Sequence, residues 1–246
     1  MKNIYTSGQY IRNNPSYHAE DSEFKCNNFV NILKKNHFNF EKINSITDIG
    51  CGVGAIIQEL NKKKLFKKDT KFTGFDINPD AINLAKKNNE TNIDFYCENY
   101  FHSSSYKKTD LIICADVYEH IEDYIGFLKK LVTGGEFFLF NIPLDVCLRS
   151  LLDNRVFSEN YKNAGHLHFY NKHVAKLILN HCNYEIIDTI YAKSFLTHVK
   201  IDSIKKMIYY IPMKFFDLIN EDLSASLFGH YSLVVLAKRS KENNIK

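Results

Sequence analysis

The chain has 246 residues, of which 45% are hydrophobic and 14% aromatic, so it can bury a full core as one large domain. Its 32 Lys and Arg exceed its 28 Asp and Glu by only four charges, which argues against a nucleic-acid partner and is compatible with a small, phosphorylated ligand. The six cysteines show no C-x-x-C spacing, so no zinc or redox pair is expected. The absence of a signal-peptide core and of any run of about eighteen apolar residues predicts a cytoplasmic protein without stable membrane insertion.

From residue 45 onward, apolar β-rich runs alternate with helical patterns, which predicts a parallel sheet wound with helices. Helices are expected after the first strand, from Asn78 with Pro79 at the first helical position, from Tyr124 to Leu131, and from Asn171. The strands are predicted at residues 43–49, 71–77, 92–99, 109–117, 134–143, 183–192 and 231–239.

We predict a single domain over residues 1–246, with a sheet core formed by residues 41–193 and 230–240. Two segments lie outside the alternation of strands and helices. Residues 1–40 form an N-terminal lid that ends in a helix, and residues 194–229 form an insertion before the last strand. Both segments are placed to cover a site at the strand ends.

Both covering segments are amphipathic. The first ends in a helix whose apolar stripe begins at Cys26 and whose cap is Asp21 or Ser22. The second contains the basic and aromatic run "IKKMIYYIPMKFF". Pro212 is expected to interrupt this helix, which favours a lid over contact with a membrane surface.

The stretch "ITDIGCGVGAI" places Gly50, Gly52 and Gly54 directly after an apolar run that contains Asp48. Glycines at such a strand-to-helix turn let a ligand approach the backbone, and in an open α/β sheet this turn lies at the ligand site. No Gly-Lys-Ser/Thr follows, which excludes a Walker loop. A dinucleotide site stays open, because Gly50, Gly52 and Ala55 fit the pattern G-x-G-x-x-A. Against it, Asp48 at the mouth of the loop would repel a pyrophosphate and attract an ammonium or sulfonium group.

The run "ITDIGCGVG" resembles motif I of the class I S-adenosylmethionine-dependent methyltransferases, and "ADVYEHI" resembles the motif that follows their fourth strand. The resemblance covers about residues 45–240 and implies a Rossmann-like α/β fold with a seven-stranded sheet whose last strand is antiparallel. It also implies S-adenosylmethionine as cofactor, with an acid after the second strand bonded to the ribose, a device that dinucleotide folds share. The cofactor-binding residues implied are Asp48, Gly50, Gly52, Gly54, Asp76, Ile77, Glu98, Asn99, Asp116 and Val117.

Methyl transfer requires alignment of the acceptor with the sulfonium and, for some acceptors, removal of a proton. Histidines near the strand ends are candidate bases, and we predict His120, His166 and His168 as catalytic residues. His166 and His168 alternate along "GHLHFY" and are expected to point the same way. No metal is predicted, because the sequence shows no acid or third ligand beside this pair.

The stretch "NNPSYHAEDSEFK" concentrates charged and aromatic residues around a helix start, and we predict Tyr10, Tyr17, His18 and Lys25 as substrate-binding residues. The stretch also resembles a run found in bacterial small-molecule methyltransferases of surface or capsular polysaccharide pathways. This resemblance implies O-methylation of a small polar acceptor, either nucleotide-linked or phosphorylated, at a sugar hydroxyl or a phosphoryl or phosphoramidate group. A monomer or a homodimer would suit such an enzyme.

The sequence lacks the motifs of several other classes of methyltransferase. An Asp/Asn-Pro-Pro-aromatic motif of DNA amino-methyltransferases is absent, and no cysteine follows a proline as RNA C5 enzymes require. A non-catalytic S-adenosylmethionine-binding module would be expected to have an eroded glycine loop. A quinone, lipid or RNA methyltransferase stays open as an alternative, as does the choice between oxygen and nitrogen as acceptor.

Overall fold

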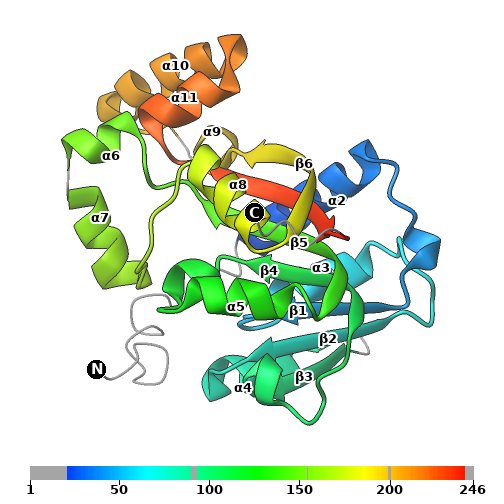
Figure 1. The fold of residues 1–246 in the computed structure, drawn as a ribbon. Helices are drawn as coiled ribbons and strands as arrows, with labels where there is room; N and C mark the ends of the chain where they lie inside the picture. Colours follow the sequence, from blue (N-terminus) through cyan, green and yellow to red (C-terminus); the bar gives the residue numbers. More distant parts are fainter. Residues whose placement is uncertain (1–20, 90–92, 154, 199–200, 242–246) are drawn as a thin grey trace.

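The computed structural model describes residues 21–89, 93–153, 155–198 and 201–241 (Figure 1). A seven-stranded sheet runs through the molecule in the order β3-β2-β1-β4-β5-β7-β6, and β7 is antiparallel to both of its neighbours. The predicted Rossmann-like methyltransferase sheet with a reversed last strand is therefore confirmed. The strands are β1 (Ser45–Ile49), β2 (Lys71–Asp76), β3 (Ile93–Cys97), β4 (Thr109–Ala115), β5 (Gly135–Pro143), β6 (Tyr184–Ala192) and β7 (Ser232–Arg239).

Helices pack on both faces of this sheet. The α-helices are α2 (Ser22–Lys35), α3 (Ala55–Lys62), α4 (Pro79–Lys87), α5 (Tyr124–Leu131), α6 (Leu148–Leu152), α7 (Arg155–Glu159), α8 (Lys172–His181), α9 (Ser194–His198), α10 (Ile204–Ile219) and α11 (Glu221–Phe228). Shorter helical turns are η2 (Phe40–Lys42), η3 (Tyr100–His102), η4 (Tyr118–His120) and the π-helical η5 (Asn160–Ala164).

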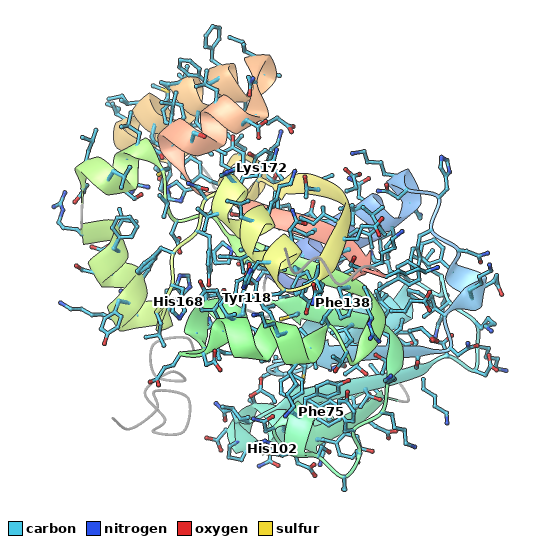
Figure 2. All side chains as sticks on the ribbon, in the orientation of Figure 1. Phe75, His102, Tyr118, Phe138, His168 and Lys172 are labelled. Atoms are coloured by element: carbon cyan, nitrogen blue, oxygen red, sulfur yellow. The ribbon has the colours of Figure 1, made fainter. Side chains whose placement is uncertain are left out.

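Alternation along the strands divides the core into two layers. In β4, Ile112 faces the layer that contains α5 and α8, whereas Leu111 and Ile113 face the layer that contains α2, α3 and α4. Phe138 of β5 belongs to the first layer, as does Tyr118 of η4 (both labelled in Figure 2). This period of two is what a parallel strand covered on both faces requires. The apolar runs seen in the sequence are therefore the centre of the sheet.

The predicted helix starts are confirmed by their caps. The Asn78 side chain accepts hydrogen bonds from the N–H groups of Asp80 and Ala81, and Pro79 occupies the first turn of α4. The Asn171 side chain accepts from Val174 N–H at the start of α8. Each cap satisfies N–H groups that have no partner within the helix. The first of these caps fixes the turn between β2 and α4 at the carboxyl edge of the sheet.

The insertion before β7 differs from its prediction. Pro212 lies inside α10, which continues without a break from Ile204 to Ile219. The neighbouring turn is held from outside the helix, since Met213 is fully buried and its carbonyl accepts a hydrogen bond from the Ser224 hydroxyl of α11. These contacts with α11 hold this part of the helix in place, although Pro212 has no N–H to donate to the Ile208 carbonyl. Figure 1 shows α10 and α11 side by side beyond α6.

The outer face of α10 is apolar and exposed. Six of its apolar side chains are between 56% and 78% exposed, namely Ile204, Ile208, Ile211, Phe215, Leu218 and Ile219. Within the described part of the chain, no helix has both the length and the apolarity needed to cross a membrane.

Candidate functional site

The glycine loop between β1 and α3 has a backbone that only glycine adopts without strain. Gly50, Gly52 and Gly54 have φ angles of +69°, +54° and +73°. The N–H groups of Gly50 and Cys51 both donate to the carbonyl of Phe75, at 2.8 and 3.0 Å, which ties the loop to the end of β2. The loop is therefore preformed at the carboxyl edge of the sheet.

The three glycines have different surroundings. A Cβ atom on Gly50 would lie 2.6 Å from a methyl carbon of Val117, and one on Gly54 would lie 2.4 Å from the ring of Phe95. A Cβ atom on Gly52 would meet no atom within 4 Å. Gly50 and Gly54 are therefore required by packing, whereas Gly52 faces open space into which a ligand can approach the backbone.

Replacing Gly54 by Ala is expected to destabilise the protein by about 2–4 kcal/mol, because left-handed backbone strain adds to a clash with the Phe95 ring. Gly52→Ala is the matched control and is expected to cost only the strain of about 1–2 kcal/mol. Urea unfolding of the two variants measures the difference. Equal midpoints would show that the loop rearranges freely around Phe95.

Asp76 closes β2 beside the open space at Gly52. Its Oδ2 accepts the Gly52 N–H at 2.8 Å, and its Oδ1 accepts the Asn78 N–H at 2.8 Å. Burial raises the pKa of the Asp76 carboxyl, and the backbone N–H donors partly offset this effect. Each carboxylate oxygen can accept a further hydrogen bond. Asp76 is thus placed to bind vicinal hydroxyls of a ligand that lies over Gly52.

Asp48 does not lie at the mouth of the loop as the sequence suggested. Its side chain is 1% exposed within β1, and burial, with the nearby Asp76 carboxylate, raises its pKa well above the ordinary value. Its position inside the parallel sheet keeps water away from the carboxyl group. The argument that an exposed negative charge at Asp48 attracts a sulfonium is therefore wrong.

The predicted adenine-binding residues lie past β3. Glu98 is exposed, and Asn99 caps η3 by accepting the Phe101 N–H at 3.0 Å. Ile77, which follows Asp76, is an exposed apolar residue with 47% of its surface accessible. The edge of the site therefore carries one apolar and two polar side chains, whose roles stay predictions.

Asp116 follows β4 with a φ angle of +54°, which is rare for a residue other than glycine. Its Oδ2 lies 2.7 Å from Lys25 Nζ of α2, and its Oδ1 accepts from the Asn141 amide at 2.7 Å. Burial opposes ionisation, but the Lys25 ammonium brings the pKa of Asp116 below its ordinary value. Lys25, which was predicted to bind substrate, thus forms an ion pair with Asp116, which was predicted to bind the cofactor.

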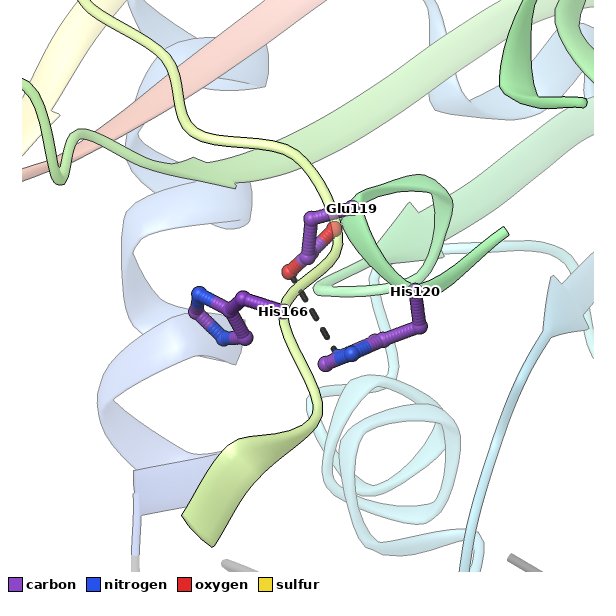
Figure 3. Close-up of side chains that lie close together, drawn as sticks. All are labelled: Glu119, His120 and His166. Carbon is purple, nitrogen blue, oxygen red and sulfur yellow. Dashed lines mark ion pairs between the residues drawn. The ribbon is translucent and has the colours of Figure 1, made fainter. Parts of the chain in front are cut away.

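Glu119 and His120 of η4 come together with His166 (Figure 3). One oxygen of Glu119 and one nitrogen of each imidazole lie within 4.8 Å of one another. The segment that carries His166 is held to η4, because the N–H groups of Leu167 and His168 donate to the Glu119 carbonyl at 2.8 and 3.1 Å. The structure therefore supplies the acid and the third potential ligand that the sequence did not show beside His166.

The two histidines of "GHLHFY" have different neighbours. His166 Nδ1 lies 2.8 Å from Asp145 Oδ2, and the Asn160 amide donates to the other Asp145 oxygen. The His168 ring, labelled in Figure 2, instead contacts the Ile121 carbonyl at 3.0 Å and packs on Tyr124. His166 and His168 thus do not form the paired arrangement expected from their spacing. Asp145 and Asn160 were missed, although an acid two residues after β5 is a signal that could have indicated Asp145.

Two cavities are lined in part by α2. A cavity of about 150 Å³ is lined by Lys25, Asp116 and Asn141 together with residues of α2 and the β6 and β7 ends. A larger cavity of about 570 Å³ lies between α2, β6 and α11, away from the glycine loop. The smaller cavity is the one that adjoins the predicted site. Tyr10, Tyr17 and His18 fall outside the described residues.

Comparison with known proteins agrees with this geometry. A family model described as a methyltransferase domain matches residues 20–189. A malonyl-[acyl-carrier protein] O-methyltransferase of Priestia megaterium is 31% identical over 150 residues, which are 61% of this chain and 51% of that protein. A ubiquinone biosynthesis O-methyltransferase of Rickettsia bellii is 28% identical over 136 residues, which are 48% of this chain and 51% of that protein. The chain thus spans about half the length of these curated relatives.

Among solved structures, the magnesium protoporphyrin IX methyltransferase of Synechocystis PCC 6803, crystallised with bound S-adenosylhomocysteine, has a similar fold. It is 17% identical, has a TM-score of 0.56, and the match covers 89% of this chain and 83% of that one. The predicted fold and the predicted cofactor, S-adenosylmethionine, are confirmed. The glycine loop, the acid after β2 and the matched family model together identify the chain as a member of the methyltransferase domain family.

Proposed function

We propose that the chain transfers the methyl group of S-adenosylmethionine to an oxygen of a small polar acceptor. The observation that carries this proposal is the open space at Gly52, which adjoins the Asp76 carboxylate. A cofactor with a ribose and a zwitterionic tail needs a close backbone approach together with an acceptor of two hydroxyl hydrogen bonds. Both features lie at the carboxyl edge of the sheet, where Asp76 at the end of β2 meets the loop between β1 and α3.

The residues of the chain would hold the cofactor and exclude water. When bound, S-adenosylmethionine supplies an activated methyl carbon for in-line displacement. Asp76 accepts the ribose hydroxyls, and Ile77 and Asn99 lie where the adenine would extend past β3. Gly52 lets the methionine part approach the loop. Binding in this mode leaves the sulfonium side facing Asp116, at the end of β4, and the segment between η5 and α8 that carries His166.

Support for an oxygen acceptor comes from the relatives, since both curated proteins described above are O-methyltransferases by name. Support for a surface-polysaccharide precursor comes from the run around His18 in the sequence, and from the cationic and imidazole groups of Lys25 and His166. A phosphoryl oxygen is already anionic at neutral pH, so it needs positioning cations more than a base. We propose a phosphorylated or nucleotide-linked acceptor on this ground.

A quinol or lipid acceptor is the second candidate. The exposed apolar face of α10 favours it, because such a face can lie on a membrane surface where these acceptors reside. The name of the Rickettsia bellii relative points the same way.

The test offers methyl-labelled S-adenosylmethionine with nucleotide-linked sugars, nucleotide-linked phosphoramidate, quinols in vesicles and transfer RNA. Label in a nucleotide-linked product supports the first candidate, and label in quinol alone supports the second. Label in transfer RNA alone would contradict both. If calorimetry detected no binding of S-adenosylmethionine to the folded protein, the proposed function itself would fail.

Residues 1–40 are proposed as a lid on the single domain, and residues 194–229 as a second cover. Deleting residues 1–20 is expected to lower kcat by on the order of 100-fold, because water entry and lost alignment both raise the barrier. The deletion leaves α2, which begins at Ser22, in place. Circular dichroism should therefore show a folded sheet. An undiminished rate in the truncated protein would show that these residues do not cover the site.

A further inference from the structure

The starting point is a buried carboxylate without a partner. Glu119 is 0% exposed, and neither of its side-chain oxygens has a hydrogen bond among the described residues. Burying a carboxylate without hydrogen bonds or a cation is strongly unfavourable, and such groups in proteins are paired, protonated or bound to metal. The backbone of Glu119 is meanwhile fixed by the two N–H donors from the His166 segment. The chain therefore holds this side chain in place despite its cost.

The two imidazoles beside Glu119 are oriented as metal ligands are. His120 Nδ1 lies 3.1 Å from the Gly165 carbonyl, which can only accept, so Nδ1 carries the proton and Nε2 a lone pair. That Nε2 lies 3.9 Å from Glu119 Oε1. His166 Nδ1 likewise donates to the Asp145 carboxylate at 2.8 Å, so its Nε2 is the nitrogen that could bind an ion. A metal-binding histidine almost always donates its other N–H to a carboxylate or backbone carbonyl.

The charges within the cluster agree with this orientation. A carboxylate oxygen repels an imidazole lone pair that faces it, whereas a cation between the two would attract both.

We propose that Glu119, His120 and His166 bind one divalent transition-metal ion. Two imidazoles and one carboxylate form a donor set suited to Zn²⁺, Mn²⁺, Fe²⁺ or Co²⁺ rather than to Ca²⁺ or Mg²⁺. Ligand atoms around such an ion lie about 3.4 Å apart in a tetrahedral site. The present spread of up to 4.8 Å would have to close to that value when the ion binds. Three protein ligands leave a coordination position for an outside oxygen.

This inference rests on the proposed function for its purpose, because the open position would receive the acceptor oxygen. The ion would hold a phosphoryl or hydroxyl oxygen and stabilise its negative charge. Asp145 would act as a positioning residue that keeps His166 in the ligating tautomer, and Asn160 would hold Asp145 in turn. His166 would then serve as a ligand rather than as a general base.

The test uses the full chain after treatment with a chelator, titrated with Co²⁺ and Zn²⁺ in the absence of cofactor and acceptor. We expect one equivalent of Co²⁺ to bind and to give the visible absorption of a site with nitrogen and oxygen ligands. Glu119→Gln and His166→Asn should each weaken binding at least tenfold, and Asp145→Asn should weaken it 10- to 100-fold. The control is His173→Asn, which removes an exposed imidazole from α8 and should leave Co²⁺ binding unchanged.

Each other result overturns the inference. If the folded wild-type protein binds no stoichiometric Co²⁺ or Zn²⁺, the Glu119 carboxyl is simply protonated. Equal affinities in wild type, Glu119→Gln and His166→Asn would place the ion elsewhere. Parallel calorimetry with S-adenosylmethionine on the metal-free protein separates the two claims. If the protein binds the cofactor but no metal, only the proposed metal site is contradicted. If it binds metal but no cofactor, only the proposed methyltransferase function is contradicted.

Discussion

Asp76→Ala is expected to lower the affinity for S-adenosylmethionine by about 10- to 150-fold, which corresponds to the 1.5–3 kcal/mol typical of hydrogen bonds to a charged group. The variant loses the acceptor for the ribose hydroxyls. It also frees the Gly52 N–H that Asp76 now fixes at 2.8 Å, so the loop loses part of its order. Isothermal titration calorimetry measures the change directly.

The matched control is Asp80→Ala, which removes an exposed carboxylate four residues later in the first turn of α4. Its affinity for the cofactor should stay at the wild-type value. Gly52→Val should resemble Asp76→Ala, because its side chain would fill the open space that the ligand needs. A folded Asp76→Ala protein with wild-type affinity would contradict the role of Asp76 in cofactor binding.

Local features of the fold were predictable because their causes are local. The cap at Asn78 needs only a side-chain oxygen two or three residues before its donors, and the loop needs glycines at its left-handed positions. The positions of the strands followed from the alternation of apolar runs with helices, whereas the reversed last strand followed from the family resemblance. The predicted positions of Gly50, Gly52 and Asp76 at one strand edge therefore agree with the structure.

Features that depend on tertiary surroundings were not predictable in the same way. Whether Asp48 is exposed depends on the sheet that closes around it, and whether Pro212 breaks a helix depends on α11. The meeting of Glu119 with His166 requires the chain to return from β5 across η4, which no sequence spacing records. The helices between β5 and α8 were missed because their short turns show no sustained periodicity.

Breaking the ion pair between Lys25 and Asp116 is the second large expected effect. Loss of one partner from a buried pair costs roughly 3–5 kcal/mol. Because these two side chains are still 19% and 28% exposed, we expect a smaller cost of about 2 kcal/mol for Lys25→Met. The double variant Lys25→Met/Asp116→Asn should recover most of this cost, because it leaves no uncompensated charge. A double-mutant cycle by urea unfolding measures the coupling.

The pH dependence of this pair has a defined sign. The pKa of Asp116 is lowered in the folded protein, so its contribution to stability is present above the unfolded pKa of about 3.9 and is lost as the pH falls through the folded pKa. In Lys25→Met the cation is gone and burial raises the pKa of Asp116, so its carboxyl takes up a proton at a higher pH. The cost of the substitution should therefore be largest near pH 7 and should shrink as the pH falls. A cost that is independent of pH between 7 and 4 would show that Lys25 stabilises α2 by packing alone.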